Sequence, residues 1–173
     1  MPIAHFEKCD FSKGWYSNRG MGEILVVEDY DDVRRMLKIL LEFENFHVLE
    51  AATGSEALDV IRNHQPDVIL MDLALPGFDG FETIRRIRAI DGFQNTPIIV
   101  LTAYTGPSTY EAALRAGSNY FMAKPIDFDE LAALIEDILS GRNPKQTRPS
   151  SQRAALNNRP PAGRSTRELE SRV

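Results

Sequence analysis

The chain has 173 residues, of which 43% are hydrophobic and 26% charged, the balance of a folded, water-soluble protein. This excludes a wholly disordered chain, a collagen-like repeat and an integral membrane protein, because no apolar run approaches the roughly 18 residues that span a bilayer. A single cysteine, Cys9, excludes an internal disulfide framework and a thiolate zinc cluster. Residues 1–15 do not resemble a secretory signal, so we expect a cytoplasmic protein.

The net charge of −5 is divided unevenly along the chain. Residues 142–173 hold seven arginines and one lysine against two glutamates, a net +6, so residues 1–141 hold −11. This basic tail has few large aliphatic side chains, so we expect it to be disordered. Whether it is merely solvated, attracts nucleic acid weakly, or binds an acidic partner or the acidic body stays open. Residues 1–21 are expected to be an N-terminal extension and residues 22–141 one domain.

Short apolar runs alternate with amphipathic stretches five times along this domain. The runs are apolar at consecutive positions, which predicts strands covered on both faces of a parallel sheet. The predicted strands are 23–28, 47–52, 67–72, 97–102 and 119–123. The stretch after the first predicted strand and the stretch after the fifth both repeat apolar residues with a helical period. Those residues are Val33, Met36, Leu37, Leu40 and Leu41 in the first helix, and Leu131, Leu134, Ile135, Ile138 and Leu139 in the last.

Helix starts are predicted at Thr53, Asp79, Ser108 and Asp127, each followed three residues later by a glutamate, and Gly141 is predicted to end the last helix. The alternation predicts the α/β class: a flavodoxin-like (βα)5, doubly wound parallel sheet with strand order 2-1-3-4-5. In such folds ligands bind at the carboxyl ends of the strands.

Polar residues gather at those carboxyl ends. Glu28 and Asp29 end the first strand, Asp72 the third and Thr102 the fourth, while Lys124 follows the fifth. Taken singly, each has a plainer interpretation as a helix cap, a turn residue, an end-of-strand residue or a solvated charge. Together, three carboxylates repel one another unless a cation intervenes, and oxygen ligands beside a phosphate suit Mg²⁺. Asp72 is then a candidate nucleophile for phosphoryl transfer.

Four segments, VVED (26–29), LMDLALPGFDG (70–80), VLTA (100–103) and KP (124–125), resemble the receiver domain of bacterial two-component response regulators. The resemblance covers about 120 residues. It implies a stand-alone, chemotaxis-receiver-like protein in which Asp72 accepts a phosphoryl group from a histidine kinase or a histidine phosphotransfer protein. Such a phosphoacceptor catalyses only its own phosphorylation and dephosphorylation.

The resemblance also assigns roles to individual residues. It implies a Mg²⁺ site made by Glu28, Asp29, Asp72 and the backbone carbonyl of Ala74, and a phosphate contact from Lys124. Further assignments are the switch residues Thr102 and Phe121, the lifetime-tuning positions Ala74 and Tyr104, and Pro125 after a cis peptide. Because Ala74 is apolar and Tyr104 bulky, we expect an aspartyl phosphate that persists for minutes or longer.

Phosphorylation is expected to draw Thr102 inward and let Phe121 turn from an exposed to a buried position. This would reshape the face formed by the fourth helix, the fifth strand and the fifth helix, through which relatives dimerise or bind targets. Kinase docking is expected on the first helix, around Val33, Arg34 and Leu37. No output domain is recognisable after the last helix, so the downstream target is expected to be an unidentified protein.

Three other functions fit these residues less well. An aspartyl-nucleophile phosphatase is disfavoured because Ala74 stands where a second aspartate is needed. A flavodoxin-type cofactor protein is disfavoured because the acidic run 28–32 would repel a phosphate. A receiver that signals without phosphorylation is disfavoured because every expected catalytic position is filled.

Overall fold

The structure is a computed structural model that describes residues 22–77 and 79–142. The predicted extension 1–21 and all but the first residue of the basic tail lie outside the described residues. Five parallel strands form one sheet in the order β2-β1-β3-β4-β5, as predicted. The strands are β1 (Glu23–Val27), β2 (His47–Ala51), β3 (Val68–Asp72), β4 (Ile98–Thr102) and β5 (Tyr120–Ala123).

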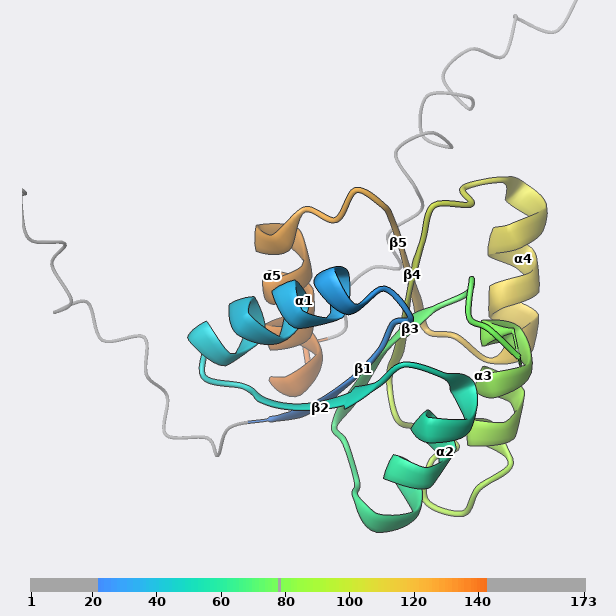
Figure 1. Cartoon of the computed structure of the whole chain (residues 1–173), viewed down its shortest axis with the longest axis horizontal. Helices are drawn as coiled ribbons and strands as arrows, with labels where there is room; N and C mark the ends of the chain where they lie inside the picture. Colours follow the sequence, from blue (N-terminus) through green and yellow to red (C-terminus); the bar gives the residue numbers. More distant parts are fainter. Residues whose placement is uncertain (1–21, 78, 143–173) are drawn as a thin grey trace, which may run out of the picture.

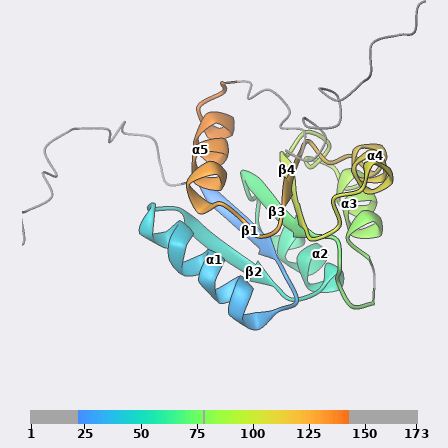
Figure 2. The same ribbon diagram turned by 90° about the horizontal axis from the view of Figure 1, so that it is seen from above.

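Five helices cover the two faces of the sheet (Figures 1 and 2). α1 and α5 lie on one face, and α2, α3 and α4 on the other. The helices are α1 (Asp31–Phe43), α2 (Gly54–Asn63), α3 (Gly80–Arg88), α4 (Pro107–Ala116) and α5 (Phe128–Leu139). No helix among residues 22–77 and 79–142 is long and apolar enough to cross a membrane.

The two faces explain why the strands are apolar at every position. On β1, Leu25 and Val27 pack into the core beneath α2, α3 and α4, whereas Ile24 and Val26 pack into the core beneath α1 and α5. Successive strand residues point to opposite faces, so a strand covered on both sides needs apolar residues throughout. All four of these side chains are buried.

Three of the four predicted helix caps are confirmed. Thr53, Asp79 and Asp127 each accept a hydrogen bond from the backbone N–H three residues later. The prediction for Ser108 is wrong, because α4 begins at Pro107 with Gly106 as its N-cap. The fixed φ angle of proline suits the first helical position, which leaves Ser108 inside the first turn. Gly141 follows α5 with φ of 70°, a conformation that ends helices.

The first helix departs in one respect from its predicted pattern. Leu37 and Leu41 are buried as expected, but Met36 is 47% exposed. Its exposed apolar surface continues along the outer side of α1 to Ile39 and Phe43. The inward-facing stripe of α1 is therefore narrower than the periodicity alone predicts.

Candidate functional site

The predicted cluster of acids exists at the carboxyl edge of the sheet. β1 and β3 are neighbours, with Val27 paired to Met71, so the residues that follow these two lie side by side. Carboxylate oxygens of Glu28, Asp29 and Asp72 lie within 4.8 Å of one another. Glu28 and Asp72 are buried, and Asp29 is half-buried. The adjacent strands β1 and β3 thus bring three negative charges together, although Glu28 and Asp72 are 44 residues apart in the sequence.

Lys124 supplies a positive charge to this cluster. Its ammonium Nζ donates hydrogen bonds to Glu28 Oε2 at 2.6 Å and to Asp72 Oδ2 at 2.5 Å. The lysine follows β5, where its backbone N–H donates to the Thr102 carbonyl at 2.9 Å, and its peptide bond to Pro125 is cis. Lys124 is therefore an ion-paired member of the site, which excludes its plainer interpretation as a solvated surface charge.

Burial perturbs both ends of the Glu28–Lys124 ion pair. Desolvation raises the pKa of Glu28, and the hydrogen bond from Lys124 opposes this shift without cancelling it. For Lys124, desolvation alone would lower the pKa, but the hydrogen bonds to Asp72 and Glu28 outweigh it and leave the pKa above its ordinary value. The ammonium group is consequently protonated at neutral pH.

The donor set fits a hard divalent cation. Within residues 22–77 and 79–142, Glu28 Oε1 is buried with no hydrogen-bond partner, an arrangement that costs free energy unless a ligand completes it. The neighbouring ligand atoms are all carboxylate oxygens, the type that Mg²⁺ prefers. Three carboxylates against one ammonium also leave the cluster with excess negative charge. Glu28, Asp29 and Asp72 would hold the ion.

Both carboxylate oxygens of Asp72 have a hydrogen-bond partner. Its Oδ1 accepts a hydrogen bond from the Ala74 backbone N–H at 3.0 Å, while Oδ2 faces Lys124. The residue is 5% exposed, and the adjoining Ala74 and Ala103 are exposed, so the rim beside the carboxylate is apolar and small. Asp72 therefore does act as a turn residue through Oδ1, which binds the Ala74 backbone. Its other oxygen, Oδ2, is paired with Lys124 in the cluster.

Neither acid at the end of β1 caps the helix that follows. The N-cap of α1 is Tyr30, which makes no side-chain capping hydrogen bond. The helix-cap interpretation of Glu28 and Asp29 is therefore excluded, and both carboxylates remain available to the cluster.

The predicted switch residues lie on β4 and β5. Thr102 is fully buried and its Oγ1 accepts a hydrogen bond from the Tyr104 backbone N–H at 3.1 Å. Phe121 is 3% exposed and packs edge-on against Tyr110 of α4, with ring centroids 5.6 Å apart. The inward position of Phe121 is thus already adopted here. Tyr104 is 64% exposed at the rim.

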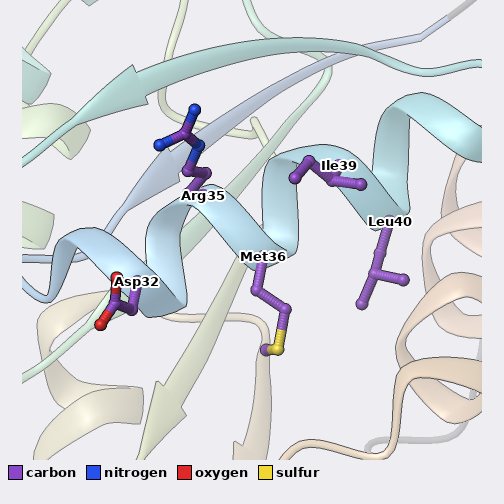
Figure 3. A pocket seen from close by; sticks show the side chains of 5 residues that line it. All are labelled: Asp32, Arg35, Met36, Ile39 and Leu40. Atoms are coloured by element: carbon purple, nitrogen blue, oxygen red, sulfur yellow. The ribbon is translucent and has the colours of Figure 1, made fainter.

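The outer surface of α1 differs from the predicted docking surface. Leu37 is 1% exposed and lies in the core, so it cannot contact a partner. A shallow hollow of about 290 Å³ lies instead on the outer side of the helix (Figure 3). Its lining residues are Asp32, Arg35, Met36, Ile39 and Leu40.

Sequence reasoning missed the backbone-binding roles of two arginines, one beside the site and one at the opposite edge of the sheet. Arg34 donates to the Glu28 carbonyl at 2.7 Å. Arg88, at the end of α3, donates to the carbonyls of Phe93, Thr96 and Gly117. No spacing rule predicts a guanidinium bonded to backbone carbonyls distant in the sequence, so the sequence held no signal for these contacts.

The fold and the site together define a doubly wound α/β domain with an ion-paired acid cluster at the carboxyl edge of its sheet. The family model for the response regulator receiver domain matches residues 24–136. The chain therefore belongs to the response regulator receiver family of two-component signalling.

Individual relatives agree with this assignment. Sporulation initiation phosphotransferase F of Bacillus subtilis is 32% identical over 68% of this chain and 93% of its own length. Among solved structures, a protein of Chloroflexus aurantiacus solved as a response regulator is 36% identical with a TM-score of 0.66, covering 69% of this chain and 98% of its own.

Another solved relative contains a metal. The receiver domain of the sensor histidine kinase PA1611 of Pseudomonas aeruginosa has a magnesium ion coordinated in its active-site cleft. It is 33% identical with a TM-score of 0.65, covering 69% of this chain and 98% of its own. Several curated relatives are longer: the chain spans about half (53%) of response regulator ArlR of Staphylococcus aureus.

Proposed function

We propose that this protein accepts a phosphoryl group on Asp72 from a histidine kinase or histidine phosphotransfer protein, in a Mg²⁺-dependent reaction. The observation that carries the proposal is the cluster of Glu28, Asp29 and Asp72, two of which pair with Lys124. The protein is then a phosphoacceptor in two-component signalling and not an enzyme acting on a separate substrate. Its cytoplasmic location stays a prediction.

The chemistry follows from the arrangement of the cluster. An oxygen of Asp72 attacks the donor's phosphorus, the P–N bond to the donor histidine breaks, and the imidazole leaves with that electron pair. When bound, Mg²⁺ neutralises charge on the transferring group. Lys124, now paired with Asp72 Oδ2, is proposed to contact a phosphoryl oxygen, and Thr102, on the neighbouring strand, is proposed to donate to another. The Ala74 carbonyl is proposed as a further metal ligand.

The signal is proposed to travel through β4 and β5. Phosphorylation adds roughly −1.5 to −2 units of charge at Asp72. The Thr102 hydroxyl would exchange its bond with the Tyr104 backbone for one to the phosphoryl group. The resulting shift would stabilise the buried position of Phe121 that the structure already contains, in which its contact with Tyr110 joins β5 to α4. The face formed by α4, β5 and α5 is the proposed surface for a homodimer or a downstream protein.

Two further elements of the proposal concern the donor and the phosphoryl lifetime. The exposed apolar side chains of Met36 and Ile39 on α1 offer a helical partner a surface beside the site (Figure 3). The side chain of Ala74 has no polar group to orient an attacking water, and the bulky Tyr104 at the rim can obstruct the path of that water, which supports a lifetime of minutes or longer. An autohydrolysis half-life of seconds at neutral pH would remove the lifetime hypothesis alone.

Acetyl phosphate tests the proposed function without a cognate kinase. Purified protein is incubated with acetyl phosphate, with and without Mg²⁺, and its intact mass is measured. We expect the wild type to gain one phosphoryl group only with Mg²⁺, and Asp72→Ala to gain none. Equal incorporation into both proteins, or none into a folded wild type that binds Mg²⁺, would overturn the proposal.

A further inference from the structure

The segment that connects β1 to α1 carries two of the three clustered carboxylates, and Arg34 binds it at two points. The Arg34 guanidinium Nη1 donates to the Glu28 carbonyl at 2.7 Å, and the Arg34 backbone N–H donates to the Tyr30 carbonyl at 2.9 Å. One residue of the first turn of α1 thus holds both ends of the segment 28–30. Asp29 lies between these two anchored carbonyls.

The guanidinium is itself oriented by neighbours on either side. Its Nε lies 3.7 Å from Glu50 Oε1 on β2, and its Nη2 binds Asp31 in the same helical turn. Glu50 is fixed in turn by Lys38, whose Nζ donates to Oε2 at 2.5 Å. The Arg34 side chain is only 16% exposed. A planar guanidinium can serve several acceptors in fixed directions at once, which a lysine ammonium on a flexible stem does less well.

The other side of the Glu28 backbone is also held. Its N–H donates to the Ala51 carbonyl at 3.1 Å, which continues the pairing of β1 with β2. With its N–H and carbonyl both bound, Glu28 has a fixed backbone, and its unpartnered Oε1 is presented to the cluster. Without the Arg34 guanidinium, the Glu28 carbonyl would lose its side-chain donor, whereas the Tyr30 carbonyl would keep its bond to the backbone N–H of residue 34. The backbone would then be held only on the far side of Asp29.

We propose that Arg34, oriented by Glu50, is a positioning residue for the Mg²⁺-binding segment 28–30. It touches neither the metal nor the phosphoryl group and acts through the backbone that carries two metal ligands. This inference rests on the proposed function, because it concerns the same metal site. Outer partners of metal ligands typically contribute 10- to 100-fold in metal affinity.

The test is Mg²⁺ binding by the full chain, measured by titration calorimetry and by the shift in melting temperature on adding Mg²⁺. We expect Arg34→Ala to weaken Mg²⁺ binding about tenfold or more. Arg34→Lys should recover part of the affinity, because one donor to the Glu28 carbonyl remains, and Glu50→Gln should weaken binding by a smaller factor. Arg62→Ala, which removes an exposed guanidinium paired within α2, is the matched control and should bind Mg²⁺ as the wild type does.

Phosphorylation kinetics separate positioning from a purely structural role. With acetyl phosphate as donor, Arg34→Ala should need a higher Mg²⁺ concentration for half-maximal rate but approach the wild-type rate at saturation. A merely structural residue would lower the melting temperature with and without Mg²⁺ equally and leave the Mg²⁺ requirement unchanged.

Three results would overturn the proposal or its basis. A folded Arg34→Ala protein that binds Mg²⁺ as tightly as the wild type overturns the inference alone. If that variant does not fold, the test uses the Mg²⁺ affinities of Glu50→Gln and Arg34→Lys instead. Wild-type Mg²⁺ affinity in both of these variants overturns the inference. A folded wild type that binds no Mg²⁺ overturns the proposed function first, and the inference with it.

Discussion

The Lys124 ammonium pairs with Glu28 and Asp72, and Asp29 lies within the same cluster of carboxylates, so the cluster carries excess negative charge whenever no cation is bound. Like charges within a few ångströms destabilise the fold that holds them together. The carboxylates that would bind a cation therefore lower the stability of the protein when no cation is bound. Such a trade-off between function and stability is common at functional sites.

Replacing Asp29 by asparagine should expose this trade-off. The substitution keeps the shape of the side chain and removes one negative charge, so in the absence of divalent cations we expect a stabilisation of about 1 kcal/mol, or about 3 °C in melting temperature. The same variant should lose most of the stabilisation that Mg²⁺ gives the wild type. Thermal unfolding with EDTA and then with Mg²⁺ measures both effects. A variant that is less stable than the wild type in EDTA would contradict the charge argument.

The positions of these residues at strand ends explain why they could be predicted from the sequence. Glu28, Asp29 and Asp72 each follow an apolar run, and parallel strands place such ends along one edge. The partners of individual oxygens could not be predicted, because they depend on side-chain rotamers. The unpartnered Glu28 Oε1 and the bond between Asp72 Oδ1 and the Ala74 N–H are of that kind.

At the scale of elements, Arg88 joins three segments that meet below α4. Its guanidinium donates to the Gly117 carbonyl at 2.9 Å, to the carbonyls of Phe93 and Thr96, and to Asn119 Oδ1 at 2.7 Å. Asn119 Oδ1 also accepts from the Ile98 N–H, where β4 begins. Gly117 has φ of 108°, and a Cβ there would lie 2.9 Å from Arg88 Cγ, so only glycine suits this position. The C-terminal end of α4 is thereby fixed to α3.

Arg88→Ala should therefore destabilise the domain by about 3 kcal/mol, because several carbonyls lose a charged donor in a half-buried setting. Arg88→Lys should recover only part of this, since one ammonium cannot serve the same directions. Urea unfolding measures the change, and hydrogen exchange should show the largest loss of protection near Gly117. A loss below 0.5 kcal/mol would contradict this role for Arg88.

On α3, an exposed ion cluster predicts a small pH dependence. Hydrogen bonds from Arg86 and Arg85 lower the pKa of Glu82. A lowered carboxyl pKa contributes stability above its unfolded value of about 4.3, and this contribution is lost as pH falls through the folded value. The wild type should exceed Glu82→Gln in stability at pH 7, and the difference should vanish at strongly acidic pH. Denaturant unfolding of both proteins over that range checks the sign, and a difference that grows on acidification would contradict it.

The bounds of the strands could be predicted from the sequence, whereas the start of α4 and the buried face of α1 could not. Each strand begins and ends within one residue of its predicted bounds, because apolar runs of this length have few other interpretations. The start of α4 was misplaced because Ser108 satisfied a capping pattern that Pro107, one residue earlier, overrode. Met36 was assigned to the core because helical periodicity does not fix the width of the buried stripe.

For the whole molecule, residues of the described domain form two cores, one on each face of the sheet. The last apolar residue of α5 that packs against the core is Leu139, and the first residue of β1 in it is Ile24. Arg142, the first residue of the basic tail and the last that the structure describes, forms an ion pair with Asp137 at 2.8 Å on the exposed side of α5. Exposed pairs of this kind contribute little to stability.

A fragment of residues 22–142 should therefore fold and accept a phosphoryl group without the extension and most of the basic tail. We expect its free energy of unfolding to lie within about 0.5 kcal/mol of that of the full chain. Urea unfolding and acetyl phosphate labelling of both proteins make the comparison. A fragment that fails to fold, or folds but takes no label, would show that residues outside this range complete the domain or its site.

The central claim, that Asp72 accepts phosphorus in a Mg²⁺-dependent reaction, is tested most directly by locating the modified residue. The protein is treated with acetyl phosphate and Mg²⁺, then with borohydride, which reduces an aspartyl phosphate to homoserine, and its peptides are sequenced by mass spectrometry. We predict homoserine at position 72 alone, and none when EDTA replaces Mg²⁺. Homoserine at Asp29 or another acid with Asp72 intact, or labelling of Asp72 that is unaffected by EDTA, would contradict the claim.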